Sequence, residues 1–242
     1  MARSARRAFW ERWSGPALVA ALPLFGCLLG GCQSVQGVTP ETMVRVIDAS
    51  YNAPAIDVTV GGTPIAANIA GPSITNYAFL PAPETTTAYI YPTGTKKATA
   101  SVATTLQAST EHSIYITDSG AGYSATLLTD QIATPPAGDI AFRFLQQAQT
   151  TGPVDIYLVP GGSDLTGTKP LLTDQIANSI TGYIDVPAGT YTMVVTPTGT
   201  TKTKYTSASL DLSAGAVRTV LIMDAQLTSN PPVTVVIGDD LN

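Results

Sequence analysis

Residues 73–82, which read SITNYAFLPA, return as residues 179–188, SITGYIDVPA, and this repetition decides how the chain is organised. A second pair follows in the same order: residues 91–97, YPTGTKK, return as residues 196–202, TPTGTTK. The two pairs are separated by 106 and 105 positions, so they share one register. Two matches in one register predict two homologous domains joined end to end.

Two pairs of chemically distinctive residues occupy equivalent places in this repeat. Tyr77 and Tyr183 share the SIT-x-Tyr pattern, which favours a tyrosine in the core or at a corner over one that stacks on a sugar. Asp57 and Asp155 each follow a proline at the start of a predicted strand. Paired carboxylates can serve acid–base catalysis, but these two belong to different domains. The interpretation we favour is that each aspartate caps a turn by accepting backbone N–H bonds.

The composition between the repeated blocks indicates β-structure. Thr, Val, Ile and Tyr recur in short runs, which suits a pleated and half-buried surface, and turn signals such as Gly61-Gly62 separate the runs. After residue 40 there is no helical periodicity longer than two turns. The predicted strands of the first repeat are residues 43–49, 56–60, 74–80, 88–91, 98–106, 113–117 and 125–129. The expected fold is all-β, with two tandem immunoglobulin-like antiparallel β-sandwiches.

The first 31 residues have the order of a secretory signal: arginines, an apolar stretch over residues 16–29, then small residues. Leu29-Gly30-Gly31-Cys32 resembles the lipobox of bacterial lipoproteins, whose precursors are cut before the cysteine, which then carries acyl chains such as palmitate. That resemblance implies membrane lipid as a partner through acylated Cys32. Gln33 follows the cysteine, which by the same resemblance favours the outer membrane and leaves open which face. The alternatives are an ordinary signal peptide or an uncleaved anchor, although 14 apolar residues reach only about 21 Å as a helix.

The expected organisation is therefore a signal peptide at 1–31, a tether at 32–42, a first β-sandwich at 43–133, a linker at 134–138 and a second β-sandwich at 139–242. Without residues 1–31, eight Lys+Arg and sixteen Asp+Glu remain, a net charge of −8. No basic stripe exists to displace phosphate counterions, which argues against nucleic-acid binding. Cys32 is then the single cysteine, so no internal disulfide or cysteine metal site is expected.

The opening of the first repeat resembles the domain-of-unknown-function 4397 family. Residues 44–50 and 52–60, VRVIDAS and NAPAIDVTV, are similar to that family's usual opening, His-Ala-Ser-Pro-Asp-Ala-Pro-x-Val-Asp-Val. This chain has Asp48 in place of the histidine and Tyr51-Asn52 in place of Pro-Asp, and the second repeat keeps only residues 153–156, PVDI. The resemblance is expected to span residues 43 to about 238. It implies an extracytoplasmic all-β protein with no known activity.

No catalytic or cofactor pattern stands out. His112 is the single histidine, and no Gly-x-Ser-x-Gly motif presents a nucleophile to it. Asp239-Asp240 with Asp118 or Asp130 could supply oxygens to calcium, but no calcium-loop motif contains them. Gly61-Gly62 and Gly161-Gly162 are better explained as hairpin turns than as phosphate loops. We therefore expect no catalytic residue, no cofactor and no metal.

These observations predict a non-catalytic envelope lipoprotein that acts as a binding or scaffolding module. Its partner would be an envelope or extracellular protein or glycan, contacted through exposed strand edges and loops. Two alternatives remain: a purely structural spacer, and an enzyme or accessory protein acting on envelope polysaccharide. The enzyme alternative requires two nearby carboxylates with raised pKa in a cleft.

Overall fold

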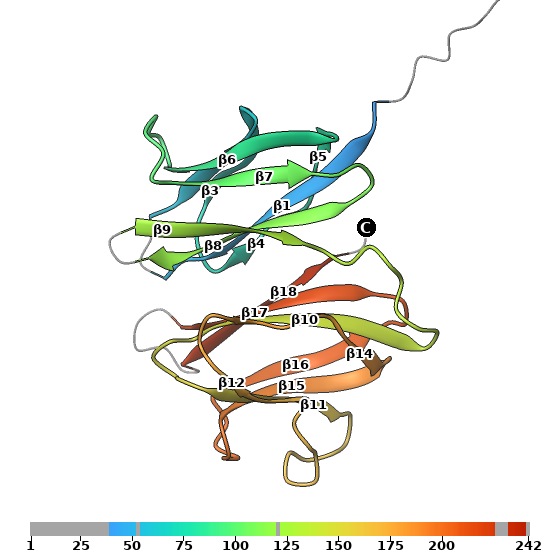
Figure 1. Ribbon diagram of the computed structural model, residues 1–242. Helices are drawn as coiled ribbons and strands as arrows, with labels where there is room; N and C mark the ends of the chain where they lie inside the picture. The colour runs from blue at the N-terminus through green and yellow to red at the C-terminus, as the bar shows by residue number, and fades with distance from the viewer. Residues whose placement is uncertain (1–38, 52–53, 120–121, 226–231, 241–242) are drawn as a thin grey trace, which may run out of the picture. The chain divides into compact units, whose positions relative to one another are not determined.

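The structure, a computed structural model, describes residues 39–51, 54–119, 122–225 and 232–240 (Figure 1). Cys32, the expected signal peptide at 1–31 and most of the expected tether at 32–42 lie outside these residues. Within the described ranges, no helix is long and apolar enough to span a membrane.

The first half of the described chain contains nine strands in two sheets. The first outer sheet has the order β3-β2-β6-β7, and the first inner sheet has the order β4-β1-β8-β9, with β5 also paired to β1. The strands are β1 Glu41–Ala49, β2 Ile56–Val60, β3 Thr63–Ile69, β4 Ser73–Ile74, β5 Ala78–Pro81, β6 Glu84–Pro92, β7 Ala100–Leu106, β8 Glu111–Ser119 and β9 Gly122–Thr129.

The second half repeats this arrangement strand for strand. The second inner sheet has the order β13-β10-β17-β18, with β14 also paired to β10, and the second outer sheet has the order β12-β11-β15-β16. The strands are β10 Asp139–Gln147, β11 Val154–Pro160, β12 Leu172–Gln175, β13 Ser179–Ile180, β14 Ile184–Pro187, β15 Gly189–Pro197, β16 Tyr205–Leu212, β17 Val217–Asp224 and β18 Val233–Asp239. Each strand from β1 to β9 therefore has a counterpart nine places later.

The fold class expected from the sequence, all-β with two similar halves, is confirmed. One strand pair in each inner sheet departs from a purely antiparallel arrangement, because β1 runs parallel to β8 and β10 runs parallel to β17. All the other pairs in the described residues are antiparallel.

Burial separates the outer sheets from the inner ones. In β2 buried and half-buried residues alternate, as expected for a strand with one face on the core and one toward solvent. In β1 and β10, by contrast, six and eight consecutive residues are buried, so both faces of the inner sheets are covered. One core lies between the two sheets of each half. A third apolar cluster joins the inner sheets to each other and contains Ile47, Ala49, Tyr115, Leu145, Leu221 and Met223.

Two local features differ from the sequence expectation. The predicted strand at 74–80 is divided into β4 and β5, and Thr75 between them donates its backbone N–H to the Val46 carbonyl, 2.9 Å away. Strand β3 was not predicted, because its sequence TPIAANI contains a proline and lacks regular alternation. It lies at an edge of its sheet, where proline is tolerated.

Candidate functional site

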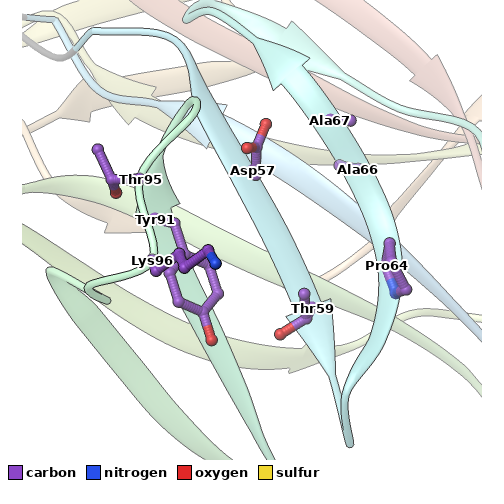
Figure 2. Close-up of a pocket in the computed structure, with 8 residues that line it drawn as sticks. All are labelled: Asp57, Thr59, Pro64, Ala66, Ala67, Tyr91, Thr95 and Lys96. Carbon is purple, nitrogen blue, oxygen red and sulfur yellow. The ribbon is translucent and has the colours of Figure 1, made fainter.

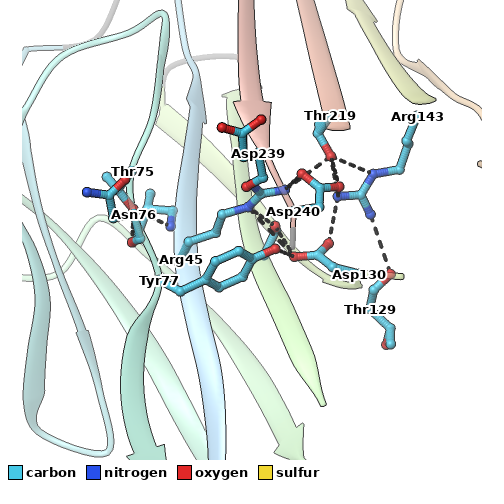
Figure 3. Close-up of polar contacts among 12 residues, drawn as sticks. Arg45, Thr75, Asn76, Tyr77, Thr129, Asp130, Arg143, Thr219, Asp239 and Asp240 are labelled. Carbon is cyan, nitrogen blue, oxygen red and sulfur yellow. Dashed lines mark hydrogen bonds and ion pairs between the residues drawn. The ribbon is translucent and has the colours of Figure 1, made fainter. Parts of the chain in front are cut away.

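A buried ionic cluster lies where the two inner sheets face each other (Figure 3). Arg45 in β1 is opposite Ser113 in β8, and Arg143 in β10 is opposite Thr219 in β17. Both arginines stand between two apolar residues of their strands, at equivalent places in the two halves, and each is at most 3% exposed. Ser113 accepts a hydrogen bond from Arg45 Nε at 2.8 Å and Thr219 one from Arg143 Nη2 at 2.9 Å, but the two buried guanidinium groups also need a counter-charge.

The partners are Asp130, which follows β9, and Asp240, which follows β18. The Arg45 Nη2 lies 2.6 Å from Asp240 Oδ1, and the Arg143 Nη2 lies 2.6 Å from Asp130 Oδ1. Each arginine also approaches the aspartate of its own half, at 3.7 Å for Arg45 and Asp130 and 3.9 Å for Arg143 and Asp240. In both short contacts, the arginine of one half thus pairs with the aspartate of the other half.

Tyr77 and Tyr183, the matched tyrosines of the sequence repeat, complete the cluster. The Tyr77 hydroxyl donates to Asp130 Oδ2 at 2.7 Å, and the Tyr183 hydroxyl donates to Asp240 Oδ2 at 2.5 Å. The Arg45 guanidinium lies 4.7 Å from the centre of the Tyr77 ring, and Arg143 lies 4.9 Å from that of Tyr183. Burial and then the neighbouring aspartates raise the pKa of both phenols, so both stay protonated as donors. Both tyrosines therefore take part in the contact between the halves through the cluster.

The cluster has the chemistry of a structural joint. Two guanidinium groups and two carboxylates balance in charge, and the aspartate side chains and that of Arg45 are 0% exposed. Ser113 and Thr219 donate to the aspartates at 2.6 Å and satisfy their remaining acceptor positions. A saturated, water-excluded network of this kind offers no open position to a substrate. Its two short ion pairs connect one half to the other.

Glu111 is an additional carboxyl group beside this balanced cluster. It is 3% exposed, and its Oε2 has no hydrogen-bond partner among the described residues. Burial, then Asp130 and Asp240, raise the pKa of Glu111 to about 7. The equivalent position in the second half is Val217, so the group has no symmetric counterpart.

His112, the single histidine, is also buried, and its Nε2 lies 2.8 Å from Thr110 Oγ1. Burial lowers the pKa of its imidazole. Asp48, which stands where the resembled family has a histidine, is buried too, and its Oδ1 accepts the Ser50 backbone N–H and hydroxyl at 3.0 and 2.6 Å. Neither residue is placed to act on a substrate in solution.

Asp57 and Asp155 occupy one position in the two outer sheets. Asp57 Oδ1 accepts the Asn68 backbone N–H at 2.8 Å, and its Oδ2 accepts that of Gly94 at 3.3 Å. Asp155 accepts the N–H groups of Asp174 and Gly199, each at 2.9 Å. Each carboxylate therefore links a neighbouring edge strand to the turn after the adjoining strand. These hydrogen bonds, led by the one from Asn68, lower the pKa of Asp57.

The carboxylates considered for calcium are placed apart or already neutralised. Asp130 and Asp240 face the two arginines, and Asp239 pairs with Arg218 at 2.9 Å. Asp118 lies instead in a polar pocket of about 380 Å³ between the halves, where its Oδ2 accepts the Tyr51 N–H at 2.6 Å. Within the described residues, no group of three or more His, Cys, Asp or Glu could hold a metal ion.

An open groove of about 500 Å³ lies on the solvent side of the first outer sheet (Figure 2). Tyr91, Asp57 and Thr59 come from neighbouring strands β6 and β2, and Asp57 is directly opposite Tyr91. Strand β3 and the turn after β6 supply the remaining lining residues: Pro64, Ala66, Ala67, Thr95 and Lys96. The Asp57 hydrogen bonds to Asn68 and Gly94 hold these two sides of the groove in place.

Tyr89 lies beside this groove on β6, opposite Thr59 of its lining. It is two residues from Tyr91, so both rings point to the same face, and their centres are 6.4 Å apart. Tyr89 is 41% exposed, whereas Ala88 and Ile90 on the other face of β6 are fully buried. Thr59 on β2 and Ser101 on β7 flank Tyr89 in register. We call this solvent-facing surface of β2, β6 and β7 around Tyr89 and Tyr91 the tyrosine face.

The equivalent surface in the second half is closed. Strand register places Tyr157 where the first half has Thr59, and Val194 where it has Tyr89. Tyr157 and Val194 are only 7% and 6% exposed, and Leu165 packs against them. Leu165 belongs to the eleven residues between β11 and β12, whereas β2 and β3 are joined by Gly61-Gly62 alone. Gly161-Gly162 thus opens a covering loop and does not form the expected hairpin turn, and the tyrosine face is the same surface without a cover.

Sequence reasoning missed both the ionic cluster and the tyrosine face. A signal for the cluster existed, because MVRVIDA and AFRFLQQ each place one arginine inside an apolar strand, 98 positions apart. The tyrosine face had a weaker signal, the alternation in AYIYP that puts Tyr89 and Tyr91 on one side.

Fold and site together define an all-β protein of two joined β-sandwich halves, with one open face and one covered face. Residues 42–157, just under half of the chain, match the family described as Domain of unknown function (DUF4397). The match spans β1 to β11 and so ends within the second half, short of the expected residue 238. No curated protein matches the sequence.

Three solved structures are similar to parts of this fold. The Bacillus anthracis TIE protein aligns at 7% identity and a TM-score of 0.24, over 83% of this chain and 44% of its own, so this chain spans less than half of that protein. A family CBM26 module from Eubacterium rectale Amy13K, in complex with maltoheptaose, aligns at 9% identity and a TM-score of 0.23. The alignment covers 81% of this chain and 96% of that module. A putative cell adhesion protein from Bacteroides eggerthii aligns at 10% identity and a TM-score of 0.21. The alignment covers 84% of this chain and 96% of that protein.

Proposed function

We propose that this chain is a non-catalytic, lipid-anchored binding module of the bacterial cell envelope, and that it binds its ligand on the tyrosine face. The observation that supports this proposal is the difference between the halves. The second half covers its outer face with Leu165 and its loop, while the first half leaves Tyr89 41% exposed beside a groove of about 500 Å³. Exposed aromatic rings next to a concave surface are typical of binding sites.

Non-catalytic action agrees with where the ionisable groups lie. Glu111 has the raised pKa that an acid–base role would need, but it is buried in the joint between the halves and away from the solvent-exposed groove. Asp57, the one carboxylate that lines the groove, already accepts hydrogen bonds from Asn68, Thr93 and Gly94. Among the described residues, no second carboxylate lines this groove.

The test is saturable co-sedimentation of the full-length chain with washed cell envelope from a strain that lacks it. We expect saturable binding of the wild-type chain. The Tyr89→Ala/Tyr91→Ala double variant should raise the dissociation constant by about a hundredfold, because each lost ring contributes about tenfold. Phe79→Ala is the matched control, since Phe79 is an aromatic residue of the same half, 66% exposed, in the inner sheet. Absence of saturable binding, or equal loss in the control, would overturn the proposal.

A structural spacer is the second candidate, and the buried cluster that joins the halves favours it. A spacer predicts no saturable ligand, so the same experiment separates the two functions. If the protein is a spacer, deleting it should cause an envelope defect, and the Tyr89→Ala/Tyr91→Ala variant should still correct that defect.

Lipid attachment through Cys32 and residence in the outer membrane are part of the proposal, and they rest on the lipobox resemblance of residues 29–32. We expect radiolabelled palmitate to enter the full-length chain and Cys32→Ser to abolish that labelling. Cys27→Ser is the matched control, because Cys27 would leave with the signal peptide. Equal labelling of the Cys32→Ser variant would show that the anchor is elsewhere.

A further inference from the structure

We infer that the ligand of the tyrosine face is a neutral polysaccharide chain, bound at one site per molecule. The inference rests on the proposed function and specifies its ligand. The chemistry begins with the rings of Tyr89 and Tyr91, which lie on one face with centres 6.4 Å apart and an angle of 41° between their planes. A sugar ring carries C–H groups on its flat faces and hydroxyls around its rim. An exposed tyrosine matches both, with an apolar ring and a polar tip.

The side chains around the two rings suit the rim of a sugar. Thr59 and Ser101 flank Tyr89, and Thr87 follows on the same face of β6. Each hydroxyl can donate one hydrogen bond and accept others, so it can pair with a sugar hydroxyl in either sense. The face therefore offers small neutral polar groups around two flat apolar ones, and it has no large aliphatic side chain of the kind that covers the second half.

A peptide ligand is less well matched to this surface. A bound strand needs free backbone N–H and C=O groups, and it finds them at a sheet edge. Strand β6 is paired on both sides, with β2 and with β7, so its backbone groups are already used in the sheet. The face therefore presents side chains alone, and the edges available to a peptide, β3 and β7, lie to either side of it.

The charges favour a neutral chain over an acidic one. Without the expected signal peptide the protein carries −8, which repels polyanions. Among the described residues that line the groove, Lys96 is the single cation and Asp57 the single anion. The Asp57 carboxylate is held by the turn at Thr93 and Gly94, so it is not free to bind a cationic ligand.

The second half predicts the stoichiometry. At the positions equivalent to Tyr91 and Tyr89 it has Thr196 and Val194, which are 0% and 6% exposed. The ring on that surface, Tyr157, is only 7% exposed, because Leu165 packs against it. One molecule therefore binds one chain segment, through its first half.

The deciding experiment treats the washed envelope with periodate, which cleaves sugar diols, or with protease, before full-length chain is added. We expect periodate to remove the binding that depends on Tyr89 and Tyr91, and protease to leave it. The opposite result, loss with protease and survival after periodate, would identify a protein ligand and overturn this inference while the proposed function stands. If untreated envelope shows no saturable binding, the proposed function falls as well.

The charge of the ligand is tested by salt and by defined polymers. The dissociation constant for a neutral chain should change by less than about twofold between 0.05 and 0.5 M NaCl, because its binding involves no ion pair that salt could screen. In native gels, soluble mixed-linkage β-glucan, amylose or mannan should retard the wild-type chain, and alginate, a polyanion, should not. Tyr89→Ala should abolish the retardation, while Tyr89→Trp and Phe79→Ala should retain it. Retardation by alginate alone, or a tenfold loss of binding at high salt, would overturn the inference.

Discussion

Arg45 in β1 and Asp240 after β18 are 195 positions apart in the chain, yet their side chains meet at 2.6 Å with no exposure to solvent. The reciprocal contact joins Arg143 to Asp130 at the same distance. This exchange makes the two sandwiches one structural unit, because each half supplies the counter-charge that the other half buries.

Asp240→Ala is expected to lower the free energy of unfolding by about 3–5 kcal/mol, because it leaves Arg45 buried without its closest carboxylate. Chemical denaturation of the full-length chain measures the change. Asp239→Ala is the matched control, since Asp239 is the adjacent residue and pairs with Arg218 while 65% exposed at its side chain. The control should lose less than about 1 kcal/mol. Equal losses would mean that the buried pair contributes no more than a surface pair.

Glu111→Gln is expected to stabilise the protein at alkaline pH. The folded-state pKa of Glu111 is raised to about 7 from an ordinary value of 4.5, so the folded state holds a proton that the unfolded state releases. Stability from this group is thus complete below about pH 4.5 and is lost as the pH rises through 7. The variant should match wild type at pH 4 and exceed it by about 1–3 kcal/mol at pH 8.

Denaturation of both proteins across this pH range measures that difference. Glu84→Gln is the matched control, because it makes the same change at an exposed position of the first outer sheet. A Glu111→Gln difference that stays constant from pH 4 to 8 would contradict the raised pKa.

Asp57→Ala and Asp155→Ala are both expected to lower the melting temperature, with the larger fall for Asp155. Each substitution removes the acceptor of two backbone N–H groups. Asp155 is 4% exposed whereas Asp57 is half-buried, so the hydrogen bonds of Asp155 are better shielded from water and their loss costs more. Calorimetry of the full-length variants provides the comparison, and an unchanged melting curve for both would exclude the capping role.

Gly238→Ala is expected to weaken the contact between the halves by about 1–3 kcal/mol, because an added Cβ would lie 2.6 Å from Ile74 Cγ2. Ile74→Ala removes that atom, so the double variant should recover part of the loss. Gly122→Ala is the control, with nothing within 4 Å of its added Cβ. Denaturation curves of the four proteins form a double-mutant cycle, and strict additivity would show that the two positions do not touch.

Much of the architecture could be predicted from local patterns, for identifiable physical reasons. In IDVTV the alternation of Ile56, Val58 and Val60 with polar residues marks a strand with one buried face, and β2 has these bounds. The repeated SIT-x-Tyr blocks predicted two similar halves, since homologous sequence adopts the same local structure. Strand β3 escaped prediction because an edge strand is specified by its pairing partner more than by its own sequence.

The candidate site depended on contacts that no local pattern encodes. The heptapeptide LLTDQIA occurs at 127–133 and at 171–177. In the first copy Asp130 is 5% exposed and bonded to Arg143, while in the second Asp174 is exposed and adopts φ 52°. The same aspartate is therefore buried and ion-paired in one copy and exposed in the other, because the strands that pack around each copy differ.

The sequence by itself determined the all-β class and the doubling of the chain, because strand periodicity and repetition are local properties of the residues. Only the tertiary structure decided that Arg45 pairs across the halves with Asp240, and that Tyr89 and Tyr91 are open where Tyr157 and Val194 are covered. The reason is that burial depends on which surfaces meet. Whether a side chain joins two halves or faces a ligand is settled by neighbours far away in the chain.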